Sequence, residues 1–219
     1  MMTVESSSSV WIRNGQRQYG MVVALLAAAL AAGCGGVPKT RYYTLNVPAA
    51  PAPSDPKTSY VLGIDRFRSP AMLRDDRIVY YLSTTEVSFY QYHRWGSDPA
   101  TLLSEFTAQW LRSSGAFSQI RMLPSRERVD YVLGGNILDF EEVDSGGTAK
   151  ARLDFTLALV RSRDGKLVWS GEKRMETPIS EGGVAGVVAA LNAACAQGLG
   201  ELAPGLIAQV EQDAKSSGQ

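Results

Sequence analysis

Histidine and cysteine are scarce in this sequence, and it holds no block of basic residues. Its 219 residues include one histidine, His93, and two cysteines, Cys34 and Cys195. So few potential ligands exclude a histidine-rich metal site and a Cys/His zinc cluster. The formal net charge is +0 at pH 7, so the chain lacks the positive surface that binds nucleic acid. The composition therefore predicts no metal, no other cofactor and no nucleic-acid partner.

Catalytic patterns are equally weak. His93 lies within "YQYHRW", and no G-x-S-x-G motif for a nucleophilic serine accompanies it. The segment 182–186, "GGVAG", lacks the G-x-G-x-x-G spacing of a phosphate-binding loop. Asp139, Glu141 and Glu142 could act as a general acid and base, but they end a predicted strand, where solvated charge is ordinary. We therefore expect a protein that is not an enzyme.

The longest apolar run is too short to cross a bilayer. It covers residues 21–32, whereas a membrane-spanning helix needs about 20 apolar residues. Arg13 and Arg17 precede it, and small residues follow it. A basic start, a short apolar stretch and small residues before a cleavage point are typical of an export signal, which we assign to residues 1–33. The rest of the chain is long enough for one domain with a substantial core.

Cys34 directly follows the expected signal. The stretch "LAAGC", residues 30–34, resembles the lipobox of bacterial lipoproteins, whose cysteine receives a diacylglycerol and becomes the first mature residue. The resemblance implies lipidation of Cys34; a disulfide with Cys195 and an unmodified packed thiol remain as alternatives. Gly35 stands where many lipoproteins of the inner membrane have aspartate. The resemblance therefore implies the periplasmic face of the outer membrane.

The mature chain is rich in strand patterns. Strands are predicted at 41–45, 60–67, 77–82, 87–94, 118–123, 130–140, 153–159 and 167–172. The segments 77–82 and 87–94 form a hairpin, and "DG" at 164–165 suits a second tight turn. Together with two helices, this order predicts an α+β fold: a single domain with a mainly antiparallel sheet and helices packed on one face.

Two helices and one linker complete the organisation. The first helix begins after Asp98, has Pro99 in its first turn and ends at Gly115. The second covers 183–214, where Pro204 is expected to kink or divide it. We place a lipid-anchored strand and a proline-rich connection at 34–59, the α+β domain at 60–214 and a disordered tail at 215–219.

Aromatic residues gather around the predicted hairpin. Six lie within sixteen residues: Tyr80, Tyr81, Phe89, Tyr90, Tyr92 and Trp95. Packing within the core and sheet explains such a group most simply. The alternative is an apolar or protein-binding surface, since aromatic side chains are favoured at interfaces.

The ordered pattern resembles the ABC-type transport auxiliary lipoproteins, a PqiC-like family. The resemblance rests on Cys34, "RYYTL" at 41–45, "SYVLGIDRFRSP" at 59–70, "MLRDDRIVYYLSTTEVSFYQYHRWGSDPATLL" at 72–103 and "SSGAF" at 113–117. It covers nearly all of the mature chain and is strongest before residue 118.

The resemblance implies a non-enzymatic outer-membrane lipoprotein that docks with an MCE-domain protein of an ABC lipid transporter and can form a homo-oligomeric ring. On that basis Tyr90, Tyr92 and Trp95 are candidate contacts for self-association or docking. Two alternatives remain open: a scaffold lipoprotein of lipopolysaccharide or peptidoglycan assembly, and a periplasmic hydrolase that depends on His93.

Overall fold

The structure is a computed structural model, and it describes residues 38–48, 58–145 and 147–217. The expected signal and Cys34 lie outside the described residues. In chain order the elements are β1 (Arg41–Tyr43), β2 (Val61–Ile64), the 3-10 helix η1 (Ala71–Leu73), β3 (Arg77–Tyr81), β4 (Val87–Trp95), α2 (Pro99–Ser114), β5 (Gln119–Met122), β6 (Tyr131–Ser145), β7 (Thr148–Arg161), β8 (Leu167–Pro178) and α3 (Gly183–Ser217). All of them belong to one compact unit, Thr40–Gln219.

The sheet is built around β6. One side of β6 pairs with β7 along its whole length, and β7 pairs in turn with β8, both antiparallel. The other side is shared, because β2 runs parallel to the start of β6 and β3 runs parallel to its end. β5 lies outside β2, and β4 and β1 lie outside β3. The α+β class is confirmed, and the sheet is mixed: its long pairs are antiparallel, while short parallel pairs extend it at both ends.

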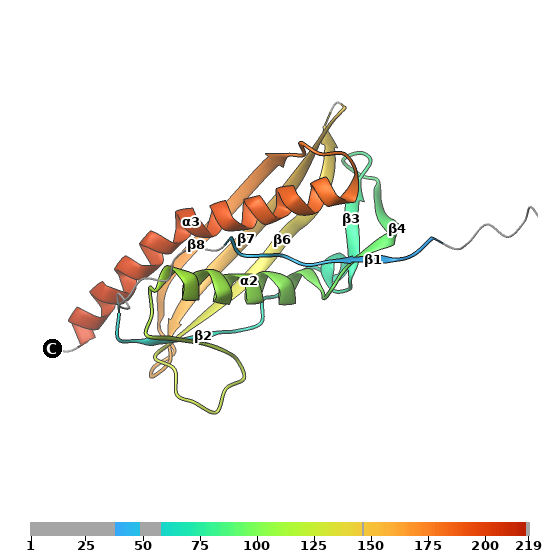
Figure 1. The fold of residues 1–219 in the computed structure, drawn as a ribbon. Helices are drawn as coiled ribbons and strands as arrows, with labels where there is room; N and C mark the ends of the chain where they lie inside the picture. Colours follow the sequence, from blue (N-terminus) through green and yellow to red (C-terminus); the bar gives the residue numbers. More distant parts are fainter. Residues whose placement is uncertain (1–37, 49–57, 146, 218–219) are drawn as a thin grey trace, which may run out of the picture. The chain divides into compact units, whose positions relative to one another are not determined.

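Alternation along β7 determines which face of the sheet is the core. Leu153, Phe155, Leu157 and Leu159 are buried, as their spacing of two predicts. Both helices cover this face (Figure 1): α3 lies over β7 and β8, and α2 packs on β5, β6 and α3. The intervening polar side chains of β7 therefore point to the face that carries no helix.

The ends of α2 follow their sequence signals. The Asp98 carboxylate accepts a hydrogen bond from the Thr101 backbone N–H at 3.1 Å, and Pro99 occupies the first turn. Gly115 ends the helix with a φ of 60°, a left-handed conformation that glycine adopts without a steric penalty. Between these ends Leu103, Phe106 and eight other residues are buried or half-buried against the core. The predicted helix is confirmed.

Pro204 lies inside α3 and does not divide it, so of the two outcomes expected from the sequence, a kink or a division, the division is wrong. Proline removes one backbone hydrogen bond and costs about 3 kcal/mol inside a helix. Here Pro204 and Gly200, whose carbonyl loses its donor, are both exposed, so water can reach that carbonyl. Leu199, Leu206 and Val210 are buried on the opposite side, and burying such a side chain contributes about 1.5–3 kcal/mol. Packing on both sides of the proline therefore outweighs the lost hydrogen bond.

α3 is long and apolar enough to cross a membrane, but half of its apolar window is buried in the folded unit. It therefore serves as the core helix of the sheet. The helix reaches Ser217, beyond the start of the disordered tail predicted at 215. Cys195 lies on its buried side, and burial raises the pKa of the Cys195 thiol, so this cysteine is a packing residue.

Candidate functional site

The aromatic hairpin forms one end of the sheet. β3 and β4 pair antiparallel, with Val79 opposite Phe89 and Tyr81 opposite Val87, which confirms the predicted hairpin. The pairing is irregular further on, because Arg77 lies opposite Arg94 and β4 therefore holds more residues than β3 over the same span. Such an irregularity changes the direction in which the following side chains point.

Trp95 shows the effect of that irregularity. Its side chain is only 1% exposed, and its ring lies 5.2 Å from the Phe140 ring in the core. Trp95 therefore presents no surface to a partner, contrary to its selection as a contact residue.

Tyr90 is half-buried and tied to the sheet. Its hydroxyl donates a hydrogen bond to the Glu142 carboxylate at 2.5 Å, and its ring lies 4.7 Å from that of Tyr80. Burial and the Glu142 carboxylate both raise the pKa of Tyr90. Tyr92 is also half-buried. Of the three aromatic candidates, Tyr90 and Tyr92 thus keep part of their surface exposed.

His93 joins β1 to β4. Its Nδ1 atom lies 2.8 Å from the Tyr43 hydroxyl, and the two rings stack with centroids 5.7 Å apart. β1 runs parallel to β4 with Arg41 opposite His93. The imidazole is therefore engaged with an aromatic partner on the neighbouring strand, and no serine hydroxyl or carboxylate is hydrogen-bonded to it in the described part of the chain.

Exposed large apolar side chains lie at both ends of the hairpin. The described residues have five exposed large apolar side chains, and three of them lie in or beside this hairpin: Tyr42, Leu82 and Val87, at 66%, 55% and 36% exposure. The other two are Leu138 and Leu167. Leu82 and Val87 flank the turn, where the Leu82 N–H donates to the Glu86 carbonyl. Leu82 and Val87 are therefore two neighbouring exposed apolar side chains at the hairpin tip, whereas Tyr42 lies opposite Arg94 at the other end of β4.

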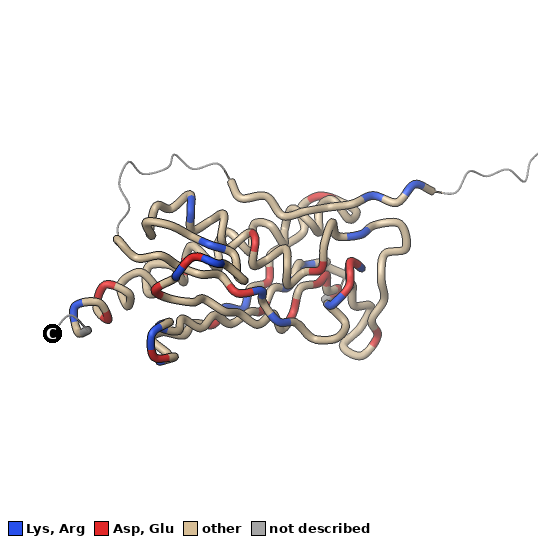
Figure 2. Tube along the Cα trace, turned by 90° about the horizontal axis from the view of Figure 1, so that it is seen from below, with Lys and Arg blue, Asp and Glu red and all other residues tan. Residues whose placement is uncertain are grey.

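The face of the sheet without helices carries paired charges. Arg174 contacts Asp154 at 2.8 Å and Asp139 at 3.5 Å, while Arg152 lies 3.1 Å from Glu176 and 3.7 Å from Glu141. Figure 2 shows basic and acidic residues interleaved along the chain. Both signs alternate on this face, so it is not a single-sign surface.

Glu141 is buried, not solvated as its sequence context suggests. β6 continues to Ser145, whereas the predicted strand ends at Phe140, so Glu141 and Glu142 are strand residues that point to opposite faces. They are therefore not a paired acid and base. Burial and the Asp139 carboxylate raise the pKa of Glu141 to about 7, against the opposing charge of Arg152.

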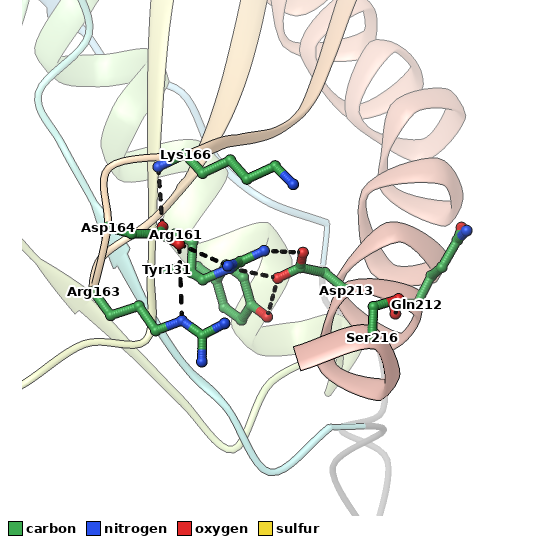
Figure 3. A network of polar contacts seen from close by, with 8 residues as sticks. All are labelled: Tyr131, Arg161, Arg163, Asp164, Lys166, Gln212, Asp213 and Ser216. Atoms are coloured by element: carbon green, nitrogen blue, oxygen red, sulfur yellow. Dashed lines mark hydrogen bonds and ion pairs between the residues drawn. The ribbon is translucent and has the colours of Figure 1, made fainter. Parts of the chain in front are cut away.

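A polar network ties α3 to the other end of the sheet (Figure 3). The Asp213 carboxylate accepts hydrogen bonds from the Tyr131 hydroxyl at 3.0 Å and from Arg161 Nε at 2.9 Å. Arg161 also donates to Asp164 at 2.7 Å through Nη1. The guanidinium group of Arg161 lowers the pKa of Asp213, although burial acts in the opposite direction. These contacts fix one turn of α3 to β6 and β7.

A cavity of about 460 Å³ adjoins this network. It is open to solvent on one side and is bordered by the β5–β6 loop, the β7–β8 turn and the end of α3. Its lining residues are Tyr60, Arg128, Val129, Asp130, Tyr131, Arg161, Ser162, Arg163 and Ala214. Its volume lies within the range of small-molecule sites.

None of the sequence motifs pointed to this cavity, although the spacing along two strands is a signal for part of it. Tyr131 and Arg161 lie opposite each other across β6 and β7, and the "SGG" turn at 145–147 is their midpoint. Residues at equal distances before and after that turn pair across the two antiparallel strands, so the start of β6 lies next to the end of β7. The position of Asp213 could not be counted in this way, because it depends on how α3 packs.

A comparison with protein families identifies the group to which the chain is related. Residues 43–203 match the family model described as the ABC-type transport auxiliary lipoprotein component. The chain belongs to this family. The match includes β3, β4, α2, β6, β7 and β8 and most of α3, so it extends over the folded unit. No match was found among curated proteins.

Solved structures show the same fold as this family member. Protein XCC0632 from Xanthomonas campestris is 22% identical, with a TM-score of 0.71 over 80% of this chain and 99% of that one. An uncharacterised protein is 16% identical, with a TM-score of 0.59 over 77% and 99%. PelC from Paraburkholderia phytofirmans, a dodecamer, is 16% identical and has a TM-score of only 0.42 over 68% of this chain and 90% of that one.

Proposed function

We propose that this auxiliary lipoprotein is a non-catalytic docking subunit of an ABC lipid transporter, anchored through Cys34 to the periplasmic face of the outer membrane. The match to the auxiliary family over residues 43–203 carries the proposal. Its partner is the transporter's MCE-domain protein, and the complex moves lipids between the membranes and thereby supports membrane integrity. Ring formation by copies of the chain belongs to the same proposal.

The lipid anchor is tested by the chemical state of Cys34. Protein recovered from its native host should carry a diacylglycerol on the Cys34 sulfur and an acyl chain on its amino group, as measured by mass spectrometry. Cys34→Ala should leave the membrane fraction, because acyl chains contribute about 0.8 kcal/mol per buried CH₂. Cys195→Ala is the matched control, because Cys195 is buried in α3 and should not affect anchoring. A free thiol at position 34 in a soluble fraction would refute the anchor.

The choice of membrane is tested at Gly35. The chain should sediment with outer membranes when the two membranes are separated on a density gradient. Gly35→Asp introduces the residue found after the cysteine in many inner-membrane lipoproteins, so this variant should move to the inner-membrane fraction. An unmodified chain in the inner-membrane fraction would contradict the outer-membrane assignment.

The docking surface is assigned to the hairpin tip and Tyr92. Leu82 and Val87 are exposed apolar side chains beside a turn that the Leu82 N–H closes by donating to the Glu86 carbonyl, and exposed apolar residues near a polar rim are typical of interfaces. Tyr90 is half-buried and contributes the part of its side chain that stays exposed. Trp95 is left out, because removing a buried tryptophan costs about 3–5 kcal/mol and would unfold the site rather than test it.

Crosslinking in intact envelopes tests the docking surface. A photocrosslinking residue at position 82 or 87 should capture the MCE-domain protein as its main adduct. Leu82→Ser with Val87→Ser should reduce recovery of that protein. Leu167→Ser is the control, since Leu167 has 56% exposure, nearly that of Leu82, but lies at the β7–β8 turn. Equal recovery with the hairpin variant and the control would refute this surface, and a main adduct from lipopolysaccharide or peptidoglycan assembly would refute the partner.

A further inference from the structure

The acidic groups around the cavity already have partners. Asp213 accepts from Tyr131 and Arg161, and Asp164 accepts from Arg161 at 2.7 Å. The Asp130 carboxylate accepts the Val61 backbone N–H at 2.8 Å. Asp130 is the one carboxylate among the lining residues, and it keeps its charge because a backbone N–H is neutral. The lining therefore holds three arginines, Arg128, Arg161 and Arg163, against one carboxylate.

Two of the lining arginines lack a close carboxylate partner among the described residues. Arg128 makes no ion pair with any described residue, and its side chain is exposed beside the cavity. Arg163 has one carboxylate contact, at 3.9 Å to the Asp164 oxygen that Arg161 already binds at 2.7 Å. Figure 3 shows the Arg163 guanidinium next to the network formed by Asp164 and Arg161. The cavity thus offers two guanidinium groups without strong partners.

The floor and wall of the cavity are rigid and partly apolar. Arg161 and Asp213 are nearly buried, and their hydrogen bonds fix the floor. Tyr60 packs edge-to-face on Tyr131, with ring centroids 5.6 Å apart. Val129 adds an aliphatic wall. A ligand that fits this cavity has an anionic group for the arginines and a less polar part that lies against the tyrosines.

We propose that the cavity binds a phosphate-bearing anion through Arg128 and Arg163, with the Ser162 hydroxyl as a further donor. Guanidinium groups bind phosphate in a bidentate manner, and a tetrahedral phosphate offers enough oxygens for two of them at once. A carboxylate offers only two oxygens. The phosphate can be free or belong to a phospholipid head group. The anion site stands independently, whereas the choice of a lipid head group rests on the proposed function.

Calorimetric titration tests the site on the full-length lipoprotein in dodecyl maltoside, a detergent without phosphate. The probes are inorganic phosphate, glycerophosphoethanolamine as a soluble head group, and succinate as a dicarboxylate. We expect a phosphate probe to bind more tightly than succinate. Arg128→Gln with Arg163→Gln should weaken that binding by about tenfold or more, because each lost contact is charge-assisted.

The control removes the same charge elsewhere. Arg126→Gln with Arg68→Gln also lowers the net charge by two, and both residues are exposed and outside the cavity. This variant should bind phosphate like the unmodified chain. Equal weakening by both double variants would show a general electrostatic effect and overturn the site, as would equal affinity for succinate. Absence of phosphate and head-group binding up to about 10 mM, above the millimolar affinity expected of a weak site, would also overturn it.

The probes separate the two sources of phosphate. Tighter binding of glycerophosphoethanolamine than of inorganic phosphate supports the head group, and the reverse supports free phosphate. Envelope crosslinking reports on the docking proposal without using this cavity. A failed crosslink with intact phosphate binding would therefore refute docking alone, and the opposite result would refute the anion site alone.

Discussion

Two buried carboxylates of this protein respond to burial in opposite ways. Asp213 is 8% exposed at the cavity end of the sheet, and Glu141 is 5% exposed on the face without helices. The pKa of Asp213 is lowered, whereas that of Glu141 is raised to about 7. Nearly equal burial therefore accompanies opposite shifts.

The difference lies in the partners of each group. Asp213 receives hydrogen bonds from Arg161 and from the Tyr131 hydroxyl, which favour its charged form. Glu141 has Arg152 at 3.7 Å, and that guanidinium lies closer to Glu176 at 3.1 Å. The nearby Asp139 adds repulsion. Donors at hydrogen-bond distance, rather than burial alone, thus decide which protonation state the fold favours.

The largest expected effect comes from removing the paired carboxylate. Asp213→Ala removes the hydrogen-bond acceptor of Tyr131 and leaves Arg161 with Asp164 as its remaining carboxylate partner, so we expect a loss of about 1.5–3 kcal/mol in the free energy of unfolding. Urea denaturation at pH 7 measures it. Because the folded pKa of Asp213 is lowered, its contribution is present above the unfolded pKa and is lost as pH falls through the folded value.

Asp213→Asn separates charge from volume in the same measurement. This variant keeps an acceptor for Tyr131 but lacks the charge that pairs with Arg161. It should lose less stability than the alanine variant at pH 7, and its stability should vary less between pH 2 and 4 than that of the unmodified chain. Equal pH dependence would show that Asp213 gains nothing from its ionisation.

Glu141→Gln should increase the free energy of unfolding, whereas the Asp213 variants decrease it. Between the ordinary pKa of 4.5 and about 7, the folded state keeps a proton that the unfolded state releases, so the Glu141 contribution falls as pH rises. Glutamine has no charge to bury. We expect a gain of about 1–3 kcal/mol in unfolding free energy at pH 8 and almost none at pH 4. Glu142→Gln is the control, since Glu142 faces Tyr90, and a gain there as large as at Glu141 would contradict this explanation.

Asp98 is a third carboxylate with hydrogen-bond donors, and it lies nearer the surface than Asp213 and Glu141. Burial acts to raise its pKa, but hydrogen bonds from Arg66 and Thr101 lower it overall. Asp98→Ala should cost about 1 kcal/mol, because it removes the cap of α2. Asp98→Asn should cost less, since asparagine also caps helices and the ion pair with the mostly exposed Arg66 contributes little. Thermal unfolding compares the two, and equal losses would assign the effect to charge.

The smallest change should follow substitution of Arg152. Arg152→Gln should raise the pKa of Glu141 further, because Arg152 is the one group that opposes its upward shift. A carboxyl ¹³C NMR titration measures the change. Lys150→Gln is the matched control, because Lys150 shares the Glu176 partner but does not contribute to the shift of Glu141. An unchanged Glu141 pKa in the Arg152 variant would show that Arg152 does not oppose the upward shift.

Local signals predicted much of this fold. Asp98, Pro99 and Gly115 defined α2, because capping depends on a few neighbouring residues. Alternation in Leu153–Leu159 gave β7 and its buried face. The α+β class followed from the order of these elements.

Local sequence signals could not predict contacts between residues that are far apart in the chain. Glu141 was expected to be solvated because acids are rarely buried, and the groups that surround it in the fold come from other strands. Burial of Asp213 likewise depends on Tyr131 and Arg161, which come from distant strands. Trp95 is buried in the core after an irregularity in the pairing of β4, and no residue pattern in β4 predicts that irregularity. For the proposed site, Arg128 and Arg163 were visible as charges, but their common cavity depends on where α3 ends.

The pairing of β1 with β4 determines where a mechanical load would enter the fold. β1 is the described strand nearest to position 34, and its three residues run parallel to His93–Trp95. Tension on a chain tethered at Cys34 would pull along β1 and shear its backbone hydrogen bonds together instead of opening them one by one. The Tyr43–His93 contact would resist the same sliding. Through this contact with Tyr43, the single histidine would help to hold β1 on β4 and so keep the domain folded under tension.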